Sequence, residues 1–253
     1  GVFGGAYLPH IRRANFTHLI AAEAIAHQSR PAPVTAVRDL DGDGTAEIEI
    51  ATPSMVLWID PARGGGIIEW DWRRARVNLA NVLTRRAETY HRQLIEVRPE
   101  QRGPDAGHDT IHTTQVRVKE PGLDRLLVYD RYRRASFLDH ILPREVTLDR
   151  FAAGEIDHGF AGRPYAVELP KSRGATHVSL VRASEARLDG AAAPARVEKR
   201  FSVEATEGIL RAAYRVTNTG GASLQARFAI ETNWAITDPA SSVRLDGAPA
   251  PAG

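Results

Sequence analysis

The segment DLDGDGTAEIEI holds the densest group of side chains that could bind a metal. Its carboxylates are Asp39, Asp41, Asp43 and Glu47. Carboxylates two residues apart in a glycine-rich loop can converge on one hard cation, and Ca²⁺ is the cation that prefers such oxygen ligands. The pattern therefore predicts a structural Ca²⁺ site formed by these four residues.

The same segment is also typical of an acidic hairpin turn, because Gly42 and Gly44 tolerate the backbone angles of tight turns. It does not match an EF-hand. That motif needs a glutamate at its twelfth position, which is Ile50 here, and helices on both sides, whereas the flanks resemble strands. Both interpretations, the Ca²⁺ loop and the turn, remain open from the sequence. A metal would be structural rather than catalytic.

Two other spacings are predicted not to form sites. His108 and His112 would be neighbours on a helix, but the surrounding text alternates as a strand does. They would then lie roughly 13 Å apart, too far to share a metal. Gly64, Gly65 and Gly66 precede a strand rather than a helix, so we predict a turn and not a phosphate-binding loop.

Catalytic carboxylate pairs are not expected. Glu69 with Asp71, and Asp124 with Asp130, have the spacing of charges on an exposed strand face. No Gly-x-Ser-x-Gly motif is present to mark a nucleophilic serine.

Aromatic side chains could bind sugars. The four tryptophans, whose rings could stack on a pyranose, are Trp58, Trp70, Trp72 and Trp234. Of these, Trp70 and Trp72 are expected to fill the core, because they alternate with charged residues in one strand. A binding role would require Trp58 and Trp234 to be exposed.

These side chains must be positioned by one helix and many strands. Pro9 at a first helical turn, followed by good helix formers, predicts a helix from residue 9 to about 27. Two apolar stripes make its buried face broad: Leu8, Ile11, Leu19, Ala22 and Ala26 form one, and Phe16, Ile20 and Ala24 the other. The prolines of QSRPAPV then break the pattern. We expect residues 1–28 to end a helical domain and residues 29–253 to form a second domain.

Beyond the break, apolar residues recur with the period of two that is typical of half-buried strands. Such runs lie at 47–50, 68–73, 197–203, 210–216 and 224–230. Asn218–Gly221 is expected to close a hairpin between the last two runs. The fold class expected is mainly β: a large antiparallel β-sandwich preceded by one α-helix.

The composition of the chain limits the classes of function that we expect for it. The 253 residues are 43% hydrophobic and 25% charged, and 33 basic against 31 acidic residues leave a net charge of +2, which gives no reason to expect nucleic acid binding. No apolar run is long enough for a membrane span. With no cysteine and no signal-peptide pattern at the start, we expect a cytoplasmic protein. We also expect both ends to continue in a longer polypeptide.

Five stretches together resemble glycoside hydrolase family 57, in its α-amylase and 4-α-glucanotransferase branch. The opening GVFGGAYLPHIRRANFTHLIAAE is similar to a conserved stretch that follows a Trp-His pair in the family; that pair is absent here. DLDGDGTAEIEI, IDPARGGGIIEWDWR, NLANVLTRRAETYH and YDRYRRASFLDHIL then resemble the C-terminal domain, in the same order. The similarity extends to about Trp234.

The resemblance implies a helical middle region followed by a galactose mutarotase-like supersandwich. It also implies a retaining mechanism in which a Glu nucleophile and an Asp acid/base act from a catalytic barrel upstream of Gly1. No catalytic residue is therefore expected in this chain. Gly4, Gly5 and Tyr7 would border the active site and shape substrate subsites; alternatively, Tyr7 only packs against the helix start.

The segment TRRAETYH is a second candidate for contact with the upstream barrel. Its charged and polar side chains, which could form charge-assisted hydrogen bonds there, are Arg85, Arg86, Glu88, Tyr90 and His91.

Three functions remain in competition. The first is the non-catalytic C-terminal part of an enzyme that acts on α-1,4-glucans such as starch, glycogen or maltodextrin, with transferase slightly preferred to hydrolase. The second is a stand-alone carbohydrate-binding or scaffolding module. The third is an independent mutarotase-like enzyme, for which no acid and base pair is evident. No cofactor is expected apart from the structural Ca²⁺.

Overall fold

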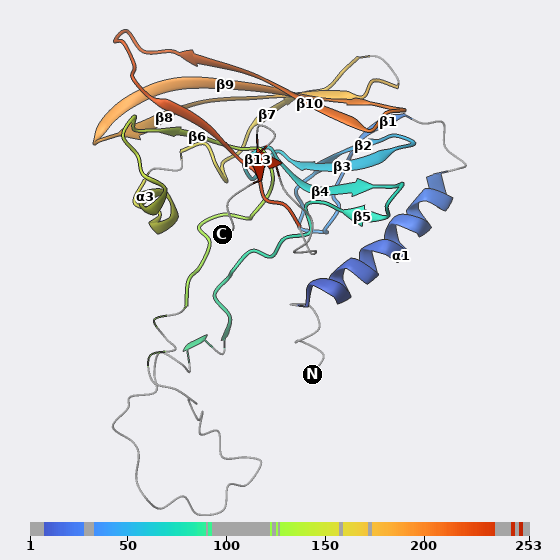
Figure 1. Ribbon diagram of the computed structural model, residues 1–253. Helices are drawn as coiled ribbons and strands as arrows, with labels where there is room; N and C mark the ends of the chain where they lie inside the picture. Colours follow the sequence, from blue (N-terminus) through green and yellow to red (C-terminus); the bar gives the residue numbers. More distant parts are fainter. Residues whose placement is uncertain are drawn as a thin grey trace, which may run out of the picture. The chain divides into compact units, whose positions relative to one another are not determined.

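A computed structural model describes residues 8–27, 33–89, 91–92, 122, 125, 127–156, 159–171, 174–235, 244–245 and 248–249 (Figure 1). The chain divides into two compact units. One comprises Gly1–Leu83 with Tyr132–Gly253, and the other Thr84–Arg131. The predicted domain boundary near residue 28 stays a prediction.

Helix α1 spans Pro9–His27, which confirms the helix predicted over these residues. Only one of its two apolar stripes is covered: Ile20 is 1% exposed, and Phe16 and Ala24 are half-buried. The other stripe faces outward, with Leu19 60% exposed. Thr17 Oγ1 donates to the carbonyl oxygen of Arg76 at 3.2 Å, so the covered side of the helix lies against the end of the first sheet.

The first sheet consists of consecutive antiparallel strands. They are β1 (Val34–Arg38), β2 (Glu47–Ala51), β3 (Met55–Asp60), β4 (Gly66–Trp72) and β5 (Val77–Asn78), in the order β1-β2-β3-β4-β5. The turn predicted at the glycine triplet joins β3 to β4. Because each strand pairs with its neighbour in sequence, both ends of the sheet carry short hairpin turns.

The second sheet is built from longer strands. Its members are β7 (Ala166–Glu168), β8 (His177–Leu188), β9 (Ala191–Glu204) and β10 (Ile209–Asn218), in the order β10-β9-β8-β7. Asp189 and Gly190, both with positive φ, form the turn between β8 and β9. This Asp-Gly pair is a strong hairpin signal that our sequence interpretation missed.

Two further pairs complete the described strands. β6 (Leu138–Leu142) pairs with β11 (Arg227–Glu231), and β12 (Arg244–Leu245) pairs with β13 (Ala248–Pro249). A short helix, α3 (Leu148–Ala153), is capped by Thr147 and Gly154. The hairpin predicted at Asn218–Gly221 is wrong, because β10 pairs with β9 and β11 pairs with β6. The turn chemistry marked a real turn there, but the chain leaves one sheet for another.

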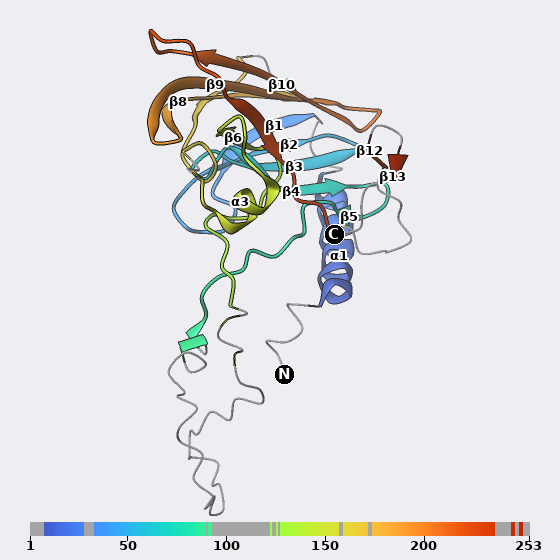
Figure 2. The same cartoon turned by 60° about the vertical axis from the view of Figure 1, so that its left-hand side comes forward.

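The first two sheets pack face to face, and Figures 1 and 2 show the long β8–β10 layer lying across β1–β4. The main core fills the space between them. It includes Ile50 and Leu57 from the first sheet and Leu180, Val197 and Phe201 from the second, all fully buried. The expected fold class, a mainly antiparallel β-sandwich preceded by one helix, is confirmed.

A β-bulge in β4 changes the face to which its residues point. Trp58 pairs with Glu69 and Ile59 with Ile67, so Ile68 is the extra residue. As a result Ile67 and Trp70 face the main core, whereas Ile68 packs in a second cluster with Trp58. The prediction that Ile68, Trp70 and Trp72 share one face is therefore wrong for Ile68.

Candidate metal site in the acidic loop

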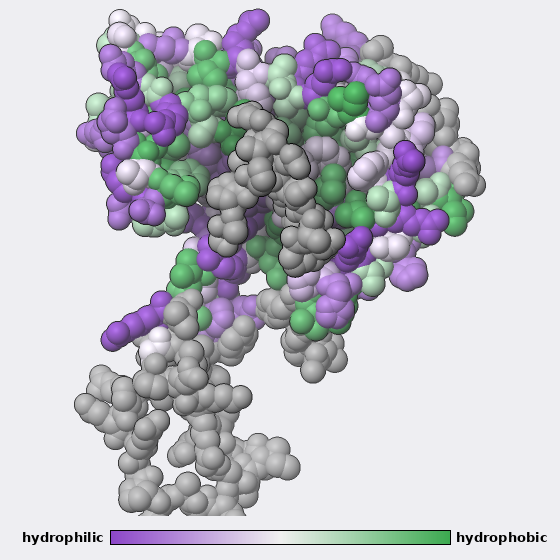
Figure 3. All heavy atoms as spheres, in the orientation of Figure 1, coloured by the Kyte–Doolittle hydropathy of each residue, from purple (hydrophilic) through white to green (hydrophobic). Residues whose placement is uncertain are grey.

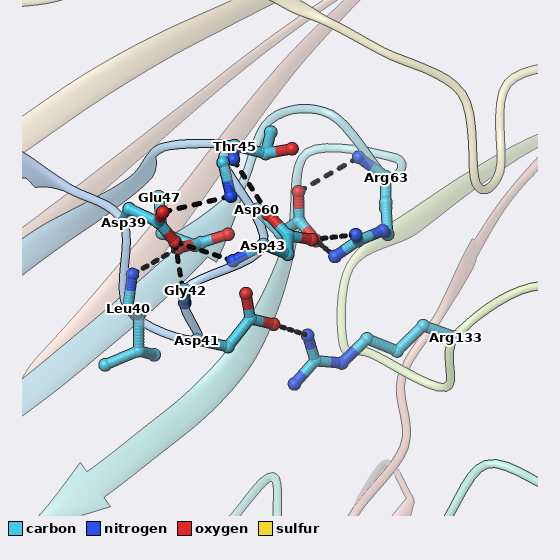
Figure 4. A network of polar contacts seen from close by, with 11 residues as sticks. Asp39, Leu40, Asp41, Gly42, Asp43, Thr45, Glu47, Asp60, Arg63 and Arg133 are labelled. Carbon is cyan, nitrogen blue, oxygen red and sulfur yellow. Dashed lines mark hydrogen bonds and ion pairs between the residues drawn. The ribbon is translucent and has the colours of Figure 1, made fainter.

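The acidic loop connects β1 to β2 and is closed by the carboxylate of Asp39 (Figure 4). One oxygen of this carboxylate accepts hydrogen bonds from the backbone N–H groups of Gly42 (2.8 Å) and Asp43 (3.2 Å), and the other accepts from Gly44 (3.0 Å). Both glycines have positive φ. Asp39 therefore fixes the backbone of the loop, as an Asx turn does.

The three aspartates that were predicted to converge lie together. Carboxylate oxygens of Asp39, Asp41 and Asp43 are all within 4.8 Å of one another. Asp43 forms an ion pair with Arg63, which holds the pKa of Asp43 below its usual value. Asp41 lies 3.8 Å from the guanidinium of Arg133. Two arginines thus supply positive charge beside the acidic loop (Figure 4).

Glu47, the fourth predicted ligand, lies at the start of β2 and is completely buried. Its Oε2 accepts a hydrogen bond from the Leu40 N–H at 2.8 Å, while its Oε1 is buried with no hydrogen-bond partner among the described residues. Burial raises the pKa of Glu47, and the negative charges of Asp41, Asp60 and Asp43 raise it further. A buried carboxylate oxygen without a partner is destabilising, and a cation would remove that penalty.

The donors present suit a hard cation. Carboxylate oxygens of three aspartates gather in one loop, and oxygen ligands are the preference of Ca²⁺. Glu47 is not part of the group whose oxygens lie within 4.8 Å of one another. Arg63 also contacts Asp60, with its Nη1 3.2 Å from Asp60 Oδ2, so it bridges the loop to β3. An ion here would compete with Arg63 for Asp43. The arrangement would brace the β1–β2 connection and offers no reacting group.

Several predicted site residues lie outside the described residues. Among them are the three that were expected to border the active site, Gly4, Gly5 and Tyr7, as well as Tyr90, His108, His112 and Asp124.

Part of the TRRAETYH cluster is engaged within its own unit. Arg85 donates from its Nε (3.1 Å) and Nη2 (2.6 Å) to Asp130, and its backbone N–H donates to the same carboxylate at 2.6 Å. His91 Nδ1 lies 3.0 Å from the Tyr129 hydroxyl. Arg85 and His91 therefore hold the two ends of the described segment together. Arg86 and Ala87 are exposed.

The tryptophans differ from expectation. Trp58 is buried, at 6% exposed, which weakens its proposed part in sugar binding. Trp234 is 43% exposed and stacks against half-buried Trp70, with ring centroids 5.1 Å apart. The prediction that Trp72 fills the core is wrong: it is 44% exposed, because it lies at the end of β4 where the core stops.

The carboxylates of β4, Glu69 and Asp71, were expected on an exposed strand face, and this is wrong for Asp71. Glu49 and Asp71 are 1% and 2% exposed. Helix α1 supplies charge partners: His27 Nε2 lies 3.5 Å from Glu49 Oε1, and Glu23 lies 3.8 Å from Arg73. The alternating pattern cannot reveal that a helix covers the second face of a sheet.

Asp71 is the most perturbed carboxyl of this face. Burial raises its pKa to about 9, with the charge of Glu69 and a hydrogen bond to it adding to the effect. One Asp71 oxygen, Oδ1, has no hydrogen-bond partner among the described residues. Asp71 therefore keeps its proton at neutral pH and donates it to Glu69.

A buried ion pair inside the sandwich was also not predicted. Lys199 Nζ lies 2.9 Å from Asp139 Oδ2, and both side chains are 0% exposed. The ammonium also donates to the carbonyl oxygens of Gly64 and Phe137, each at 2.8 Å, and Tyr165 donates its hydroxyl to Asp139 at 2.5 Å. The sequence signal that could have revealed this pair is Lys199 itself, because it occupies an inward-facing position in the alternating run 197–203. The pair joins β9 to β6 and to the glycine turn.

Comparison with known proteins decides the family. The family profile described as "Alpha-amylase/4-alpha-glucanotransferase, C-terminal" matches residues 39–246. The chain belongs to this family. The matched residues include the acidic loop, strands β2 to β5 of the first sheet and the whole second sheet, and the match confirms the resemblance to this branch of glycoside hydrolase family 57.

Individual relatives agree. A 4-alpha-glucanotransferase of Thermococcus litoralis is 34% identical over 238 residues, which are 93% of this chain and 34% of the relative. Alpha-amylase 1 of Dictyoglomus thermophilum is 41% identical over 149 residues, 59% of this chain and 21% of that protein. The crystal structure of the T. litoralis enzyme superposes with a TM-score of 0.68 at 30% identity, covering 91% of this chain and 30% of that one.

The chain thus spans about a third of the length of its T. litoralis relative. None of the helices in the described ranges is both long enough and apolar enough to cross a bilayer.

Proposed function

We propose that this chain is the non-catalytic C-terminal part of an enzyme that acts on α-1,4-glucans. The observation that carries the proposal is the extent of the similarity: 93% of the chain aligns with only 34% of a 4-alpha-glucanotransferase, and the matching family is described as C-terminal. The remaining two thirds of such a relative are available to hold the reacting groups.

The described residues support a structural rather than a catalytic role. Two carboxyls with unusual surroundings are enclosed: Asp71, whose pKa is raised by burial, is 2% exposed, and Asp139, which pairs with Lys199, is fully buried. A retaining glycosidase needs two carboxyl groups about 5–5.5 Å apart on either side of a bond that the substrate brings in from solvent. We propose that these two carboxylates lie upstream of Gly1.

The outward stripe of α1 fits the same proposal. Ile11 and Leu19 of this stripe are 36% and 60% exposed, and Leu8, directly before the helix, is 44% exposed. Exposed apolar side chains that follow one another along a helix favour a packing partner. We propose that the upstream part of the enzyme covers them, and that Gly4, Gly5 and Tyr7 just before the helix reach the substrate subsites.

The test is a comparison of activity. The 253-residue chain and a longer polypeptide that includes the upstream region are incubated separately with maltoheptaose, and the products are separated by chain length. We expect only the longer polypeptide to form products; longer and shorter maltooligosaccharides together indicate transfer, and shorter ones alone indicate hydrolysis. Product formation by the 253-residue chain would contradict the proposal.

We also propose that the enzyme is located in the cytoplasm. Cell fractionation tests this location.

We also propose that the acidic loop binds a structural Ca²⁺ through Asp39, Asp41, Asp43 and Glu47. The partnerless buried oxygen of Glu47 supports this, since it lies beside a loop in which three further carboxylates gather. Binding to the folded state alone stabilises a protein by about 2.7 kcal/mol when the ligand is at 100 times its Kd.

The Ca²⁺ proposal predicts a higher melting temperature in millimolar Ca²⁺ than in EDTA. Asp41→Asn should abolish the difference, because it removes one of the charged ligands. The loop itself should stay intact, because the carboxylate that holds its backbone is that of Asp39. Asp149→Asn, at an acidic residue of α3, is the matched control and should retain it. Equal melting temperatures of the parent chain in Ca²⁺ and in EDTA, with no saturable heat of binding, would refute the site.

A further inference from the structure

A hollow of about 440 Å³ lies where three hairpin turns meet. The turn from β2 to β3 contributes Ser54, the end of β4 and the turn after it contribute Trp72 and Arg74, and the turn from β9 to β10 contributes Thr206 and Glu207. The two sheets of the sandwich therefore both supply residues to one site on the same unit.

The turns are tied to one another. Ser54 Oγ donates to the carbonyl oxygen of Ala205 at 3.0 Å, which links the first sheet to the second. The backbone N–H of Arg73 donates to the carbonyl oxygen of Ser54 at 3.1 Å. Arg73 is further held by ion pairing with Glu23 of α1. The hollow is thus preorganised, which lowers the entropic cost of binding a ligand.

Trp72 gives this hollow its aromatic surface. The residue is 44% exposed, whereas its cross-strand partner Met55 is 2% exposed. The core ends at Met55, and the indole continues the sheet face beyond it. An exposed tryptophan presents a large, rigid apolar area with little conformational entropy to lose on binding.

The remaining side chains define the polarity of the ligand. Arg74 and Glu207 make no hydrogen bond or ion pair with any residue that the structure describes, so their donors and acceptors are available. They carry opposite charges, which favours a neutral ligand over an anion or a cation. Figure 3 shows hydrophilic and hydrophobic residues interspersed over the described part of one face of the molecule.

A pyranose meets these requirements. Its C–H face is apolar and packs flat on an aromatic ring, and its hydroxyl groups both donate to a carboxylate and accept from a guanidinium. We propose that the Trp72 hollow binds a segment of an α-1,4-glucan chain, with Trp72 as the stacking surface and Arg74 and Glu207 as hydroxyl partners. The choice of an α-glucan rests on the proposed function; the choice of a sugar rests on the hollow itself.

The test is a calorimetric titration of the 253-residue chain with maltoheptaose and, separately, with cellohexaose. We expect saturable binding of maltoheptaose and much weaker binding of cellohexaose. Trp72→Ala should weaken maltoheptaose binding by roughly tenfold or more, because a stacked aromatic surface is lost. Leu148→Ala is the control, since Leu148 is an exposed apolar residue of α3 (79%) that does not line the hollow; it should bind as the parent chain does.

Arg74→Ala and Glu207→Ala provide a second line of evidence that does not alter the indole, and each should weaken binding by roughly threefold to tenfold. Circular dichroism and melting curves establish that each variant is folded. No saturable binding, equal affinity in Trp72→Ala and the parent chain, or equal affinity for cellohexaose would overturn the proposal.

This test is independent of catalysis. If maltoheptaose binds through Trp72 but the 253-residue chain proves active by itself, only the proposed non-catalytic function fails. If the longer polypeptide alone is active but maltoheptaose does not bind to this chain, only the glucan site fails.

Discussion

Two pairs of ionisable side chains are buried or half-buried in this sandwich, and burial restricts the protonation states that they can adopt. Asp71 and Glu69 share one proton under α1, and Lys199 is neutralised by Asp139 inside the core. Each arrangement leaves one carboxyl oxygen without a hydrogen-bond partner among the described residues, Asp71 Oδ1 and Asp139 Oδ1, but the second provides the Lys199 ammonium with three oxygen partners. The two sites should therefore respond to substitution in opposite directions.

Asp71→Asn should stabilise the chain at alkaline pH. The folded protein keeps the Asp71 proton up to about pH 9, whereas an unfolded aspartate loses it near pH 3.8. Between these values the folded state binds more protons, so stability falls as the pH rises. Asparagine retains a donor to Glu69 and removes this dependence. Urea unfolding should give a free energy of unfolding higher by about 1–3 kcal/mol at pH 8 and little changed at pH 4.

Glu168→Gln, at an exposed carboxylate on β7, serves as the control and should have no such pH-dependent effect. A free energy of unfolding for Asp71→Asn that is unchanged or lower at pH 8 would show that Asp71 is ionised in the folded protein.

Lys199→Met should be strongly destabilising. Removing the ammonium leaves Asp139 charged and buried, and breaking a buried pair in this way costs about 3–5 kcal/mol. The double variant Lys199→Met with Asp139→Asn should recover part of the loss, because no unpaired charge remains. Lys171→Met, at an exposed lysine, is the control. A loss below about 1 kcal/mol in chemical denaturation would mean that water or a rearranged side chain compensates Asp139.

At the scale of elements, the connections between strands determine where functional residues lie. The turn from β3 to β4 brings Gly64 against Leu138 and Gly162: a Cβ atom at Gly64 would lie 2.7 Å from Leu138 Cδ2 and 2.9 Å from the Gly162 nitrogen. The Gly64 carbonyl oxygen also accepts a hydrogen bond from Lys199 Nζ. This turn is therefore part of the core and not a free surface loop.

Gly64→Ala tests that view. Its φ is +87°, so alanine adds backbone strain as well as steric overlap. Gly190 has a similar φ of +89° but no atom within 4 Å of its Cβ position, so Gly190→Ala measures the strain alone. We expect losses of about 1 kcal/mol for Gly190→Ala and about 3 kcal/mol or more for Gly64→Ala. Equal losses measured by urea unfolding would show that the turn moves freely to accept the methyl group.

The sequence predicted those elements whose signals are local. Pro9 and a run of good helix formers located α1, and the alternation at 197–203 located the buried positions of β9, including Lys199. Two failures were non-local. The bulge at Ile68 depends on pairing with β3, and the burial of Glu49 and Asp71 depends on a helix distant in sequence. Asn218–Gly221 had the composition of a turn, but composition does not say with which strand the chain pairs next.

The candidate sites follow the same division. The spacing of Asp39, Asp41 and Asp43 predicted a cluster, because all three lie in one loop. The hollow beside Trp72 could not be predicted, since its residues come from three turns that only the packing of two sheets brings together. Trp72 was predicted to fill the core from its position in an alternating strand. Strand alternation does not show where along the strand the core ends.

At the scale of the whole molecule, the proposed function joins this sandwich to a larger enzyme. The chain aligns with about a third of its glucanotransferase relative, its helix α1 exposes an apolar stripe, and Asp71 and Asp139 are enclosed. These features fit an accessory part that packs against a catalytic part and holds glucan.

The most direct test of the central claim is to trap the covalent intermediate of the proposed retaining reaction. A fluorinated maltosyl fluoride, which forms the glycosyl-enzyme but hydrolyses slowly, is incubated with the longer polypeptide, and the labelled residue is identified by peptide mass spectrometry. The account predicts a labelled glutamate upstream of Gly1 and no label on the 253-residue chain alone. A label on any carboxylate within residues 1–253 would contradict it and would place the catalytic centre in the sandwich.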